Sequence, residues 1–178
     1  MDELCLVDTA YYINASFPPL LREERKVDVM LSFDYGLSDK FKSVVQTQNY
    51  CAEQYITFPK VELSEEDIKN PKECYVFSEP VNPDVPIILH FPLVNDTFQQ
   101  FSRPGVERKT VEEKEGGVVE LSGLWSTYRT LNLTYSEKEF DKLLNLTEYN
   151  VENNEEAILQ ALRDAIARKQ KHRASDNI

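Results

Sequence analysis

Two patterns of apolar and polar residues predict the strands of this chain. Residues 4–7 form an uninterrupted apolar run, which is typical of a strand buried on both faces. Residues 27–34 alternate strictly, with Val27, Val29, Leu31 and Phe33 on one face and Asp28, Met30, Ser32 and Asp34 on the other. Residues 74–77 and 86–94 are the next predicted strands, and the second is apolar enough to be central. Residues 118–121 and 130–135 are weaker strand predictions.

Helical spacing and capping residues predict the helices. Ser38 and Asp39 begin one helix that runs to about residue 52, with Phe41, Val44, Val45 and Cys51 facing inward. Ser64 begins a short helix that Pro71 ends, and Ser136 with Glu139 forms a capping box before a helix that carries Phe140, Leu143 and Leu144. Asn153 is the predicted N-cap of the last helix, whose apolar face is Ile158, Ala161, Leu162, Ala165 and Ile166. Residues 1–170 are assigned to a part of one domain, and residues 171–178 are assigned to a basic, disordered tail.

Asp8 is the first candidate for chemistry because it directly follows the apolar run of residues 4–7. Functional groups of α/β proteins gather at the carboxyl ends of strands. The alternative is that Asp8 only caps a turn through its side-chain oxygen. Asp34 is a second carboxylate at a strand end, but nothing in the sequence fixes its separation from Asp8, so a glycosidase pair is weakly supported.

Composition and charge narrow the class of protein. The chain has 178 residues, 41% of them hydrophobic, which supplies a core. The formal net charge of -11 argues against binding to nucleic acid. Three cysteines without paired spacing indicate reduced thiols in a cytosolic protein. The acidic start, Met1-Asp2-Glu3, is unlike a secretory signal, and no apolar run is long enough to span a bilayer.

A search for known motifs leaves few further candidates. The chain contains no glycine-rich phosphate loop, no Gly-x-Ser-x-Gly elbow and no His/Cys spacing of a metal site, so neither a metal nor a cofactor is expected. His90 lies inside an apolar strand and is interpreted as a core residue rather than a base. Lys169, Lys171 and Arg173 near the end of the last helix either offset its dipole or contact anionic lipid.

Several sequence blocks, taken in order, resemble the C-terminal part of the catalytic domain of the cytosolic (group IV) phospholipases A2. The blocks are residues 6–10, 17–29, 72–77, 91–98, 104–108 and 133–151. The tripeptide Asp8-Thr9-Ala10 resembles the form that this segment has in the delta/epsilon/zeta-like branch of the family. The resemblance implies a patatin-like, three-layer α/β fold that is incomplete without the upstream part of the same domain.

The resemblance also implies a function. Family members hydrolyse phospholipid acyl esters, or transfer the acyl group, through a Ser-Asp dyad and an acyl-enzyme. The resemblance assigns the role of the dyad aspartate to Asp8. It also implies that Arg25 and Arg22 either face the phospholipid headgroup or pair with Glu23 and Glu24. Calcium is implied only by a separate membrane-targeting domain, and the location is cytoplasmic with recruitment to a phospholipid membrane surface.

The serine elbow is absent from this sequence, so the chain alone is expected to be inactive. The alternative is a truncated, non-catalytic module that binds anionic membranes or protein partners.

Overall fold

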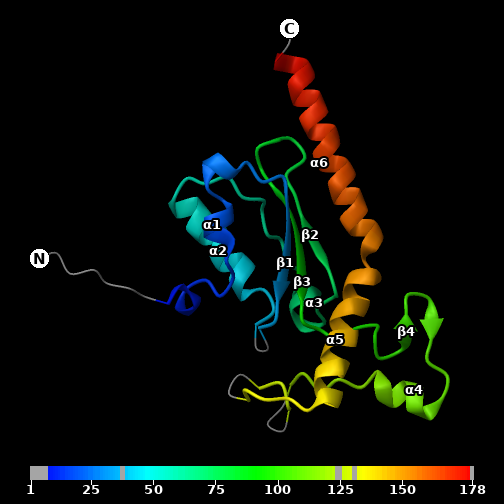
Figure 1. The fold of residues 1–178 in the computed structure, drawn as a ribbon. Helices are drawn as coiled ribbons and strands as arrows, with labels where there is room; N and C mark the ends of the chain where they lie inside the picture. Colours follow the sequence, from blue (N-terminus) through cyan, green and yellow to red (C-terminus); the bar gives the residue numbers. More distant parts are fainter. Residues whose placement is uncertain (1–7, 37–38, 123–125, 130–131, 177–178) are drawn as a thin grey trace, which may run out of the picture.

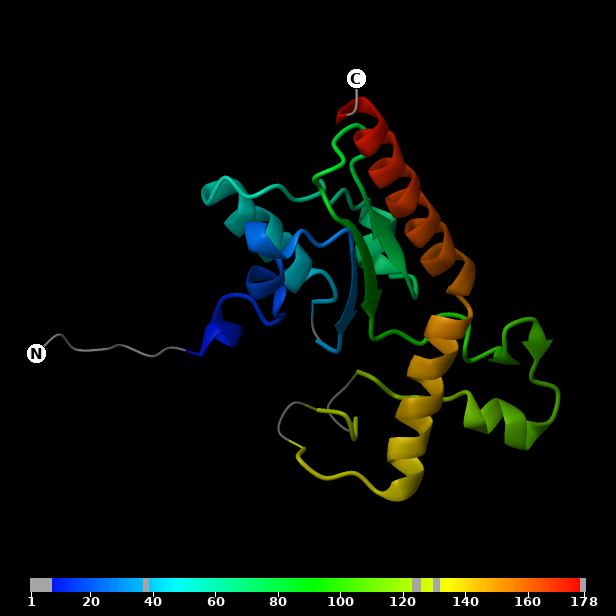
Figure 2. The same ribbon diagram turned by 45° about the horizontal axis from the view of Figure 1, so that its top comes forward.

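The computed structural model describes residues 8–36, 39–122, 126–129 and 132–176. A three-stranded sheet has the order β1-β3-β2, where β1 is Val29–Asp34, β2 is Tyr75–Phe77 and β3 is Ile87–Pro92. Strand β1 runs parallel to β3, and β2 runs antiparallel to it. Helices α1 (Phe17–Leu20) and α2 (Lys42–Glu53) cover one face, and α6 (Glu155–Asp176) covers the other (Figures 1 and 2). The three-layer α/β prediction is therefore confirmed.

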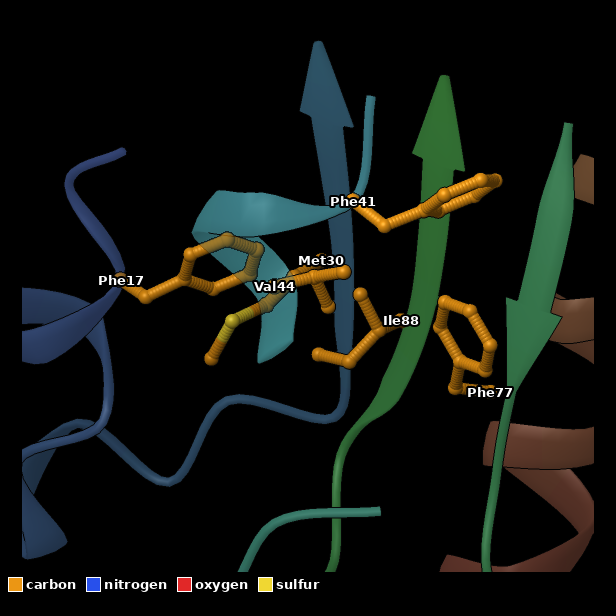
Figure 3. Close-up of a cluster of buried hydrophobic side chains, with 6 residues drawn as sticks. All are labelled: Phe17, Met30, Phe41, Val44, Phe77 and Ile88. Carbon is orange, nitrogen blue, oxygen red and sulfur yellow. The ribbon is translucent and has the colours of Figure 1, made fainter. Parts of the chain in front are cut away.

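Strand β3 is central, as its sequence predicted. All six of its residues are buried, because β1 and β2 flank it and helices cover both of its faces. On the α2 side, Ile88 packs in a cluster with Phe17, Met30, Phe41, Val44 and Phe77 (Figure 3). Phe41 also meets the Tyr75 ring edge to face at 4.9 Å.

The alternating pattern of β1 is confirmed, but its partly polar face is the buried one. Met30, Ser32 and Asp34 point toward the α2 layer, whereas Leu31 and Phe33 are exposed. The reason lies in the packing of α2, which covers the face of Met30 with Phe41 and Val44. On the opposite face, Val29 of β1 packs against the cluster that contains Ala161 and Ala165 of α6.

Helix α6 packs through small residues. Ala161 and Ala165 are buried against Ile87, Leu89 and Phe91 of β3. The predicted five-residue apolar face is therefore wrong in part, because Leu162 and Ile166 are exposed. Alanines let the helix approach the sheet closely, and this contact turns the larger side chains to the flank of the helix.

Capping boxes begin three of the remaining helices. They are α3 (Glu65–Lys69, capped by Ser64), α4 (Val111–Gly116, capped by Thr110) and α5 (Glu137–Glu152, capped by Ser136). The boxes at Ser64 and Ser136 confirm the sequence prediction. Helix α5 buries Leu146 and Tyr149 against Leu93 and Phe98, whereas Phe140 and Leu144 are exposed. Strands β4 (Phe101–Arg103) and β5 (Val106–Glu107) form a hairpin beside α4, turning at Gly105 with φ of +75°.

Four local predictions differ from the structure. Residues 118–121 are not a strand, and neither are residues 132–135, the described part of the predicted strand 130–135, because they have no strand neighbour among the described residues. Asn153 is the C-cap of α5 instead of the N-cap of α6. Residues 171–176, expected in a disordered tail, continue α6.

Glu73 joins the α5–α6 corner to the sheet. Its buried carboxylate accepts hydrogen bonds from the backbone N–H of Thr97 at 3.0 Å and from the side-chain amides of Asn153 and Asn154 at 2.8 and 3.3 Å. The hydroxyl of Thr97 donates to the same carboxylate and contacts the Tyr149 hydroxyl at 2.9 Å. Asn153 is therefore held where one helix ends, which explains why it does not begin the next.

Candidate functional site

Asp8 lies at the start of the described chain. It is the N-cap of a 3-10 turn, η1 (Thr9–Tyr11), and its Oδ1 accepts a hydrogen bond from the Ala10 N–H at 2.9 Å. The turn-capping alternative is thus a geometric fact, and it leaves the carboxylate exposed. The apolar run predicted as a strand, residues 4–7, lies outside the described residues.

The surroundings of Asp8 are open to solvent. The side chains of Tyr11 and Tyr12 are 88% and 50% exposed. Of the connection that follows, Ile13 and Phe17 are buried. A carboxylate acts as a base near neutral pH when it is desolvated, so Asp8 needs a cover that the described residues do not supply.

Arg22 is the N-cap of a second 3-10 turn, η2 (Glu23–Arg25), and Arg25 is the last residue of that turn. Both arginines are exposed. Among the described residues neither forms an ion pair with Glu23 or Glu24, in contrast to the pairing that the sequence left open. Lys26 follows with φ of 46°, a left-handed conformation that ends the turn and directs the chain into β1.

The candidate membrane-contact residues of α6, Lys169, Lys171 and Arg173, already interact with other groups of the chain. Lys169 Nζ lies 2.6 Å from Asp28 Oδ2, which connects α6 to the residue before β1. Lys171 and Arg173 also interact with other groups of the chain. All three side chains are exposed enough to meet a second partner.

His90 is a satisfied core residue, as predicted. It is fully buried, its Nε2 contacts the Lys40 carbonyl oxygen at 2.8 Å, and its Nδ1 lies 3.3 Å from the Ser32 hydroxyl. Burial lowers the pKa of His90, which keeps the imidazole neutral at physiological pH. A neutral imidazole can donate to the carbonyl and accept from the hydroxyl at once.

Asp34 and Lys40 extend this cluster, and sequence reasoning missed their association. Asp34 is buried at the end of β1, and its Oδ1 accepts from the Gly36 N–H at 2.8 Å. Lys40 Nζ donates to the Gly36 carbonyl at 3.0 Å. Burial lowers the pKa of Lys40, and the charge of Asp34 opposes that shift. The alternation of β1 put Asp34 on one face with Met30 and Ser32. The sequence did not indicate that this face is the buried one.

A hollow of about 460 Å³ lies between the β4–β5 hairpin and α5. Arg103, Arg108, Glu148 and Glu152 are among its lining residues. The Arg108 guanidinium is committed to structure, since it donates to the carbonyls of Phe98 and Glu113 and lies 4.4 Å above the Phe98 ring centroid. Mixed charges line the hollow, so it selects no single ligand charge.

Substitution of Gly117 tests how tightly Arg108 is held. A Cβ at Gly117 would lie 2.8 Å from Arg108 Nε and 2.9 Å from the Gln99 carbonyl oxygen. Gly117→Ala is expected to lower the free energy of unfolding by about 1–3 kcal/mol, measured by urea denaturation. Gly116→Ala is the matched control, because its Cβ would have 3.4 Å to the nearest atom, Arg108 Nη1. Equal stability of the two variants would contradict this account.

Burial also changes the thiol pKa values of the described cysteines, Cys51 and Cys74, which are free thiols as predicted. It raises the pKa of Cys51 to about 11 and that of Cys74 to about 12. A raised thiol pKa means less thiolate at a given pH. Both thiols are therefore expected to react with iodoacetamide at pH 8 more than 10-fold slower in the folded chain than in urea. Peptide mass spectrometry of the labelled chain separates these two sites from Cys5, and equal rates would contradict the prediction.

Among the described residues, no three His, Cys, Asp or Glu side chains lie close enough to hold a metal ion. No helix in the described part of the chain is long and apolar enough to cross a membrane.

Comparison with known proteins finds relatives of this chain at nearly half identity. It is 49% identical over 170 residues to cytosolic phospholipase A2 delta of Homo sapiens and 48% identical to human cytosolic phospholipase A2 epsilon. Over the segment that it spans, the chain is similar to the cytosolic phospholipases A2. The mouse zeta protein is 45% identical over 168 residues. No family model matches the chain.

The fold agrees with a solved cytosolic phospholipase A2. The structure of human GIVD cytosolic phospholipase A2 superposes with a TM-score of 0.88 at 48% identity, over 92% of this chain. The same human protein has been solved with methyl gamma-linolenyl fluorophosphonate, at a TM-score of 0.85. This chain spans 20% of the length of the human delta protein and 22% of that solved chain. The resemblance inferred from the sequence blocks is confirmed, and the matched segment is a small part of those proteins.

Proposed function

We propose that this chain is the C-terminal part of a phospholipase A2 catalytic domain and that Asp8 is the aspartate of its Ser-Asp dyad. The observation that carries the proposal is 49% identity over 170 residues to a phospholipase A2, a match that covers 96% of this chain. The reaction class is hydrolysis of a phospholipid acyl ester, or transfer of that acyl group to another acceptor.

The proposed reaction gives Asp8 one task, the movement of a proton. The serine hydroxyl, supplied by the rest of the domain, attacks the ester carbonyl while the Asp8 carboxylate takes its proton. That proton then passes to the departing lysophospholipid oxygen as the ester bond breaks and the acyl-enzyme forms. Water, or another nucleophile, then attacks the acyl carbonyl and loses a proton to Asp8, and that proton passes to the serine oxygen as the acyl–serine bond breaks and the acyl group leaves.

Two features of Asp8 bear on this role. Its exposure leaves one face of the carboxylate open to a partner group. The hydrogen bond from the Ala10 N–H fixes Oδ1 and leaves Oδ2 for the serine. Cover by the rest of the domain would desolvate the carboxylate and raise its basicity toward the value that catalysis needs.

Arg25 and Arg22 are proposed to face the phospholipid headgroup. Both are exposed, and neither forms an ion pair with a carboxylate among the described residues. A guanidinium binds a phosphate through two parallel hydrogen bonds. Calcium enters the proposal only through a separate membrane-targeting domain, and the proposed location is the cytosol with recruitment to a membrane surface.

We also propose that α6 contacts an anionic membrane surface through Lys169, Lys171 and Arg173. Replacing Lys169, Lys171 and Arg173 by alanine is expected to weaken binding to anionic vesicles by about 10-fold or more, since each cation near such a surface contributes about 1 kcal/mol. The control replaces Lys109, Lys114 and Lys138, exposed cations of other segments. Vesicle sedimentation at low salt measures the difference, and identical binding by both triple variants would refute this contact.

The test of the whole proposal uses phospholipid vesicles labelled in one acyl chain. A full-length protein that carries this chain is expected to release labelled fatty acid or to transfer it. The chain by itself is expected to release none and to resist labelling by a fluorophosphonate, since it has no Gly-x-Ser-x-Gly elbow. Stoichiometric labelling of the chain would contradict the proposal. Vesicle binding by the chain without hydrolysis in either form would favour the non-catalytic module instead.

A further inference from the structure

The hollow of about 460 Å³ beside α5 is lined by charges of opposite sign that come from different elements. The β4–β5 hairpin and the residue that follows it supply Arg103 and Arg108, and α5 supplies Glu148 and Glu152. The hairpin lies beside α5 in both views of the fold (Figures 1 and 2). The volume falls within the range of sites that bind small molecules, about 300–1,000 Å³.

Arg108 brings a buried cation to the hollow without a carboxylate partner. It is only 9% exposed, and its Nε and Nη1 donate to the carbonyl oxygens of Phe98 and Glu113 at 3.0 and 2.9 Å. Within the described part of the chain it forms no ion pair, and its Nη2 donates no hydrogen bond. Buried charges in proteins are normally paired. Nη2, with the exposed Arg103 nearby on the hairpin, is therefore available to an anionic group in the hollow.

Helix α5 brings two carboxylates to the other side of the hollow. Glu148 and Glu152 are four residues apart, so their side chains are neighbours on one face of the helix, and Asn145 lies on the same face. Like charges at this spacing repel each other. Neither glutamate forms an ion pair with a described residue. An ammonium group between the two carboxylates would relieve this repulsion and would donate hydrogen bonds to both.

The charged residues of the hollow fit a ligand that carries both charges and no net charge. A simple anion would face two glutamates, and a simple cation would face two arginines. A metal ion fits no better, since no three suitable side chains lie together among the residues that the structure describes. A guanidinium binds two oxygens of a phosphate at once, and a primary ammonium has three N–H donors for carboxylates. A phosphodiester joined to a primary ammonium combines these features.

We propose that the hollow binds a glycerophosphoethanolamine group, with its phosphate at Arg103 and Arg108 and its ammonium at Glu148 and Glu152. This group exists as a free small molecule and as the polar part of a phospholipid, and both sources present the same two charges. Asp8 is not among the residues that line the hollow, so the inference goes beyond the proposed dyad.

Calorimetric titration of a full-length phospholipase that carries this chain tests the proposal. Glycerophosphoethanolamine at low salt is expected to bind with a Kd of about 1 mM or lower. Glycerophosphocholine, whose quaternary ammonium has no N–H donor, is expected to bind at least about 10-fold more weakly, and so is glycerol phosphate, which lacks the ammonium. Absence of glycerophosphoethanolamine binding would overturn the proposal. Equal binding of all three compounds would also overturn it, because the hollow would then recognise only an anion.

Variants at exposed side chains locate the binding without disturbing the buried Arg108. Arg103→Gln and Glu148→Gln are each expected to weaken glycerophosphoethanolamine binding by at least about 5-fold, because each removes a charged partner of the ligand. The matched controls are Arg163→Gln in α6 and Glu53→Gln in α2, exposed residues that do not line the hollow. Unchanged affinity in both hollow variants would show that the compound binds elsewhere.

Two further measurements separate the sources of the ligand and the role of the dyad. Vesicles of phosphatidylethanolamine and of phosphatidylcholine are compared by sedimentation. A preference for phosphatidylethanolamine that Glu148→Gln removes would assign the site to a lipid headgroup. A preference that Glu148→Gln leaves unchanged, with weaker binding of the free compound, would assign it to the free molecule. Asp8→Asn is expected to lower hydrolysis and to leave glycerophosphoethanolamine binding intact, so failure of the dyad assignment would not affect this site.

Discussion

Asp8→Asn in a full-length phospholipase that carries this chain is expected to lower kcat for ester hydrolysis by about 100-fold to 10,000-fold, the range that general-base catalysis contributes. Asparagine has the shape of aspartate but cannot accept the serine proton. Its side-chain carbonyl can still accept from the Ala10 N–H, as Asp8 Oδ1 does at 2.9 Å, so the η1 turn is preserved. The loss would therefore report chemistry rather than folding.

The control is Asp84→Asn, which removes an exposed carboxylate from another loop and is expected to leave kcat unchanged. Both variants are compared by release of labelled fatty acid from vesicles at saturating substrate. A KM effect without a kcat effect would assign Asp8 to substrate binding. Full activity of Asp8→Asn would remove Asp8 from the dyad, and Asp8 would then be only the cap that the structure shows.

Glu73→Ala is expected to lower the free energy of unfolding by about 3 kcal/mol or more, because hydrogen bonds to a buried charged group contribute about 1.5–3 kcal/mol each and lost partners stay unsatisfied. The Glu73 side chain is 4% exposed. Its loss would leave the Thr97 N–H without this acceptor, and the amides of Asn153 and Asn154 would each lose one of their two acceptors. Urea denaturation measures the change in stability.

Two further variants show whether the stability loss of Glu73→Ala comes from its hydrogen bonds. Glu73→Gln keeps an acceptor for Thr97 but turns an amide N–H₂ toward Asn153 or Thr97, so an intermediate loss is expected. Glu53→Ala removes an exposed carboxylate and is expected to change stability by less than about 0.5 kcal/mol. A Glu73→Ala chain as stable as the Glu53→Ala chain would show that the corner is held by apolar contacts instead.

Local sequence signals determined the elements that depend on near neighbours. The capping boxes at Ser64 and Ser136 satisfy free N–H groups within one turn, so the sequence alone locates those helix starts. The apolar run of β3 determined a central strand, because only a position between two neighbours and two layers buries six residues in succession. Sequence blocks likewise indicated the resemblance to the cytosolic phospholipases A2 without tertiary information.

Tertiary packing decided what local patterns leave open. The alternation of β1 is compatible with either face inward, and the cover of Met30 by Phe41 and Val44 chose the face that also buries Asp34. Asn153 is an equally good cap in two helices, and its hydrogen bond to the distant Glu73 placed it at the end of α5. Periodicity gave α6 an apolar stripe, but close contact at Ala161 and Ala165 exposed Leu162 and Ile166. In each case the sequence determined which residues can form an element, and contacts between residues far apart in the chain decided which side of it is buried.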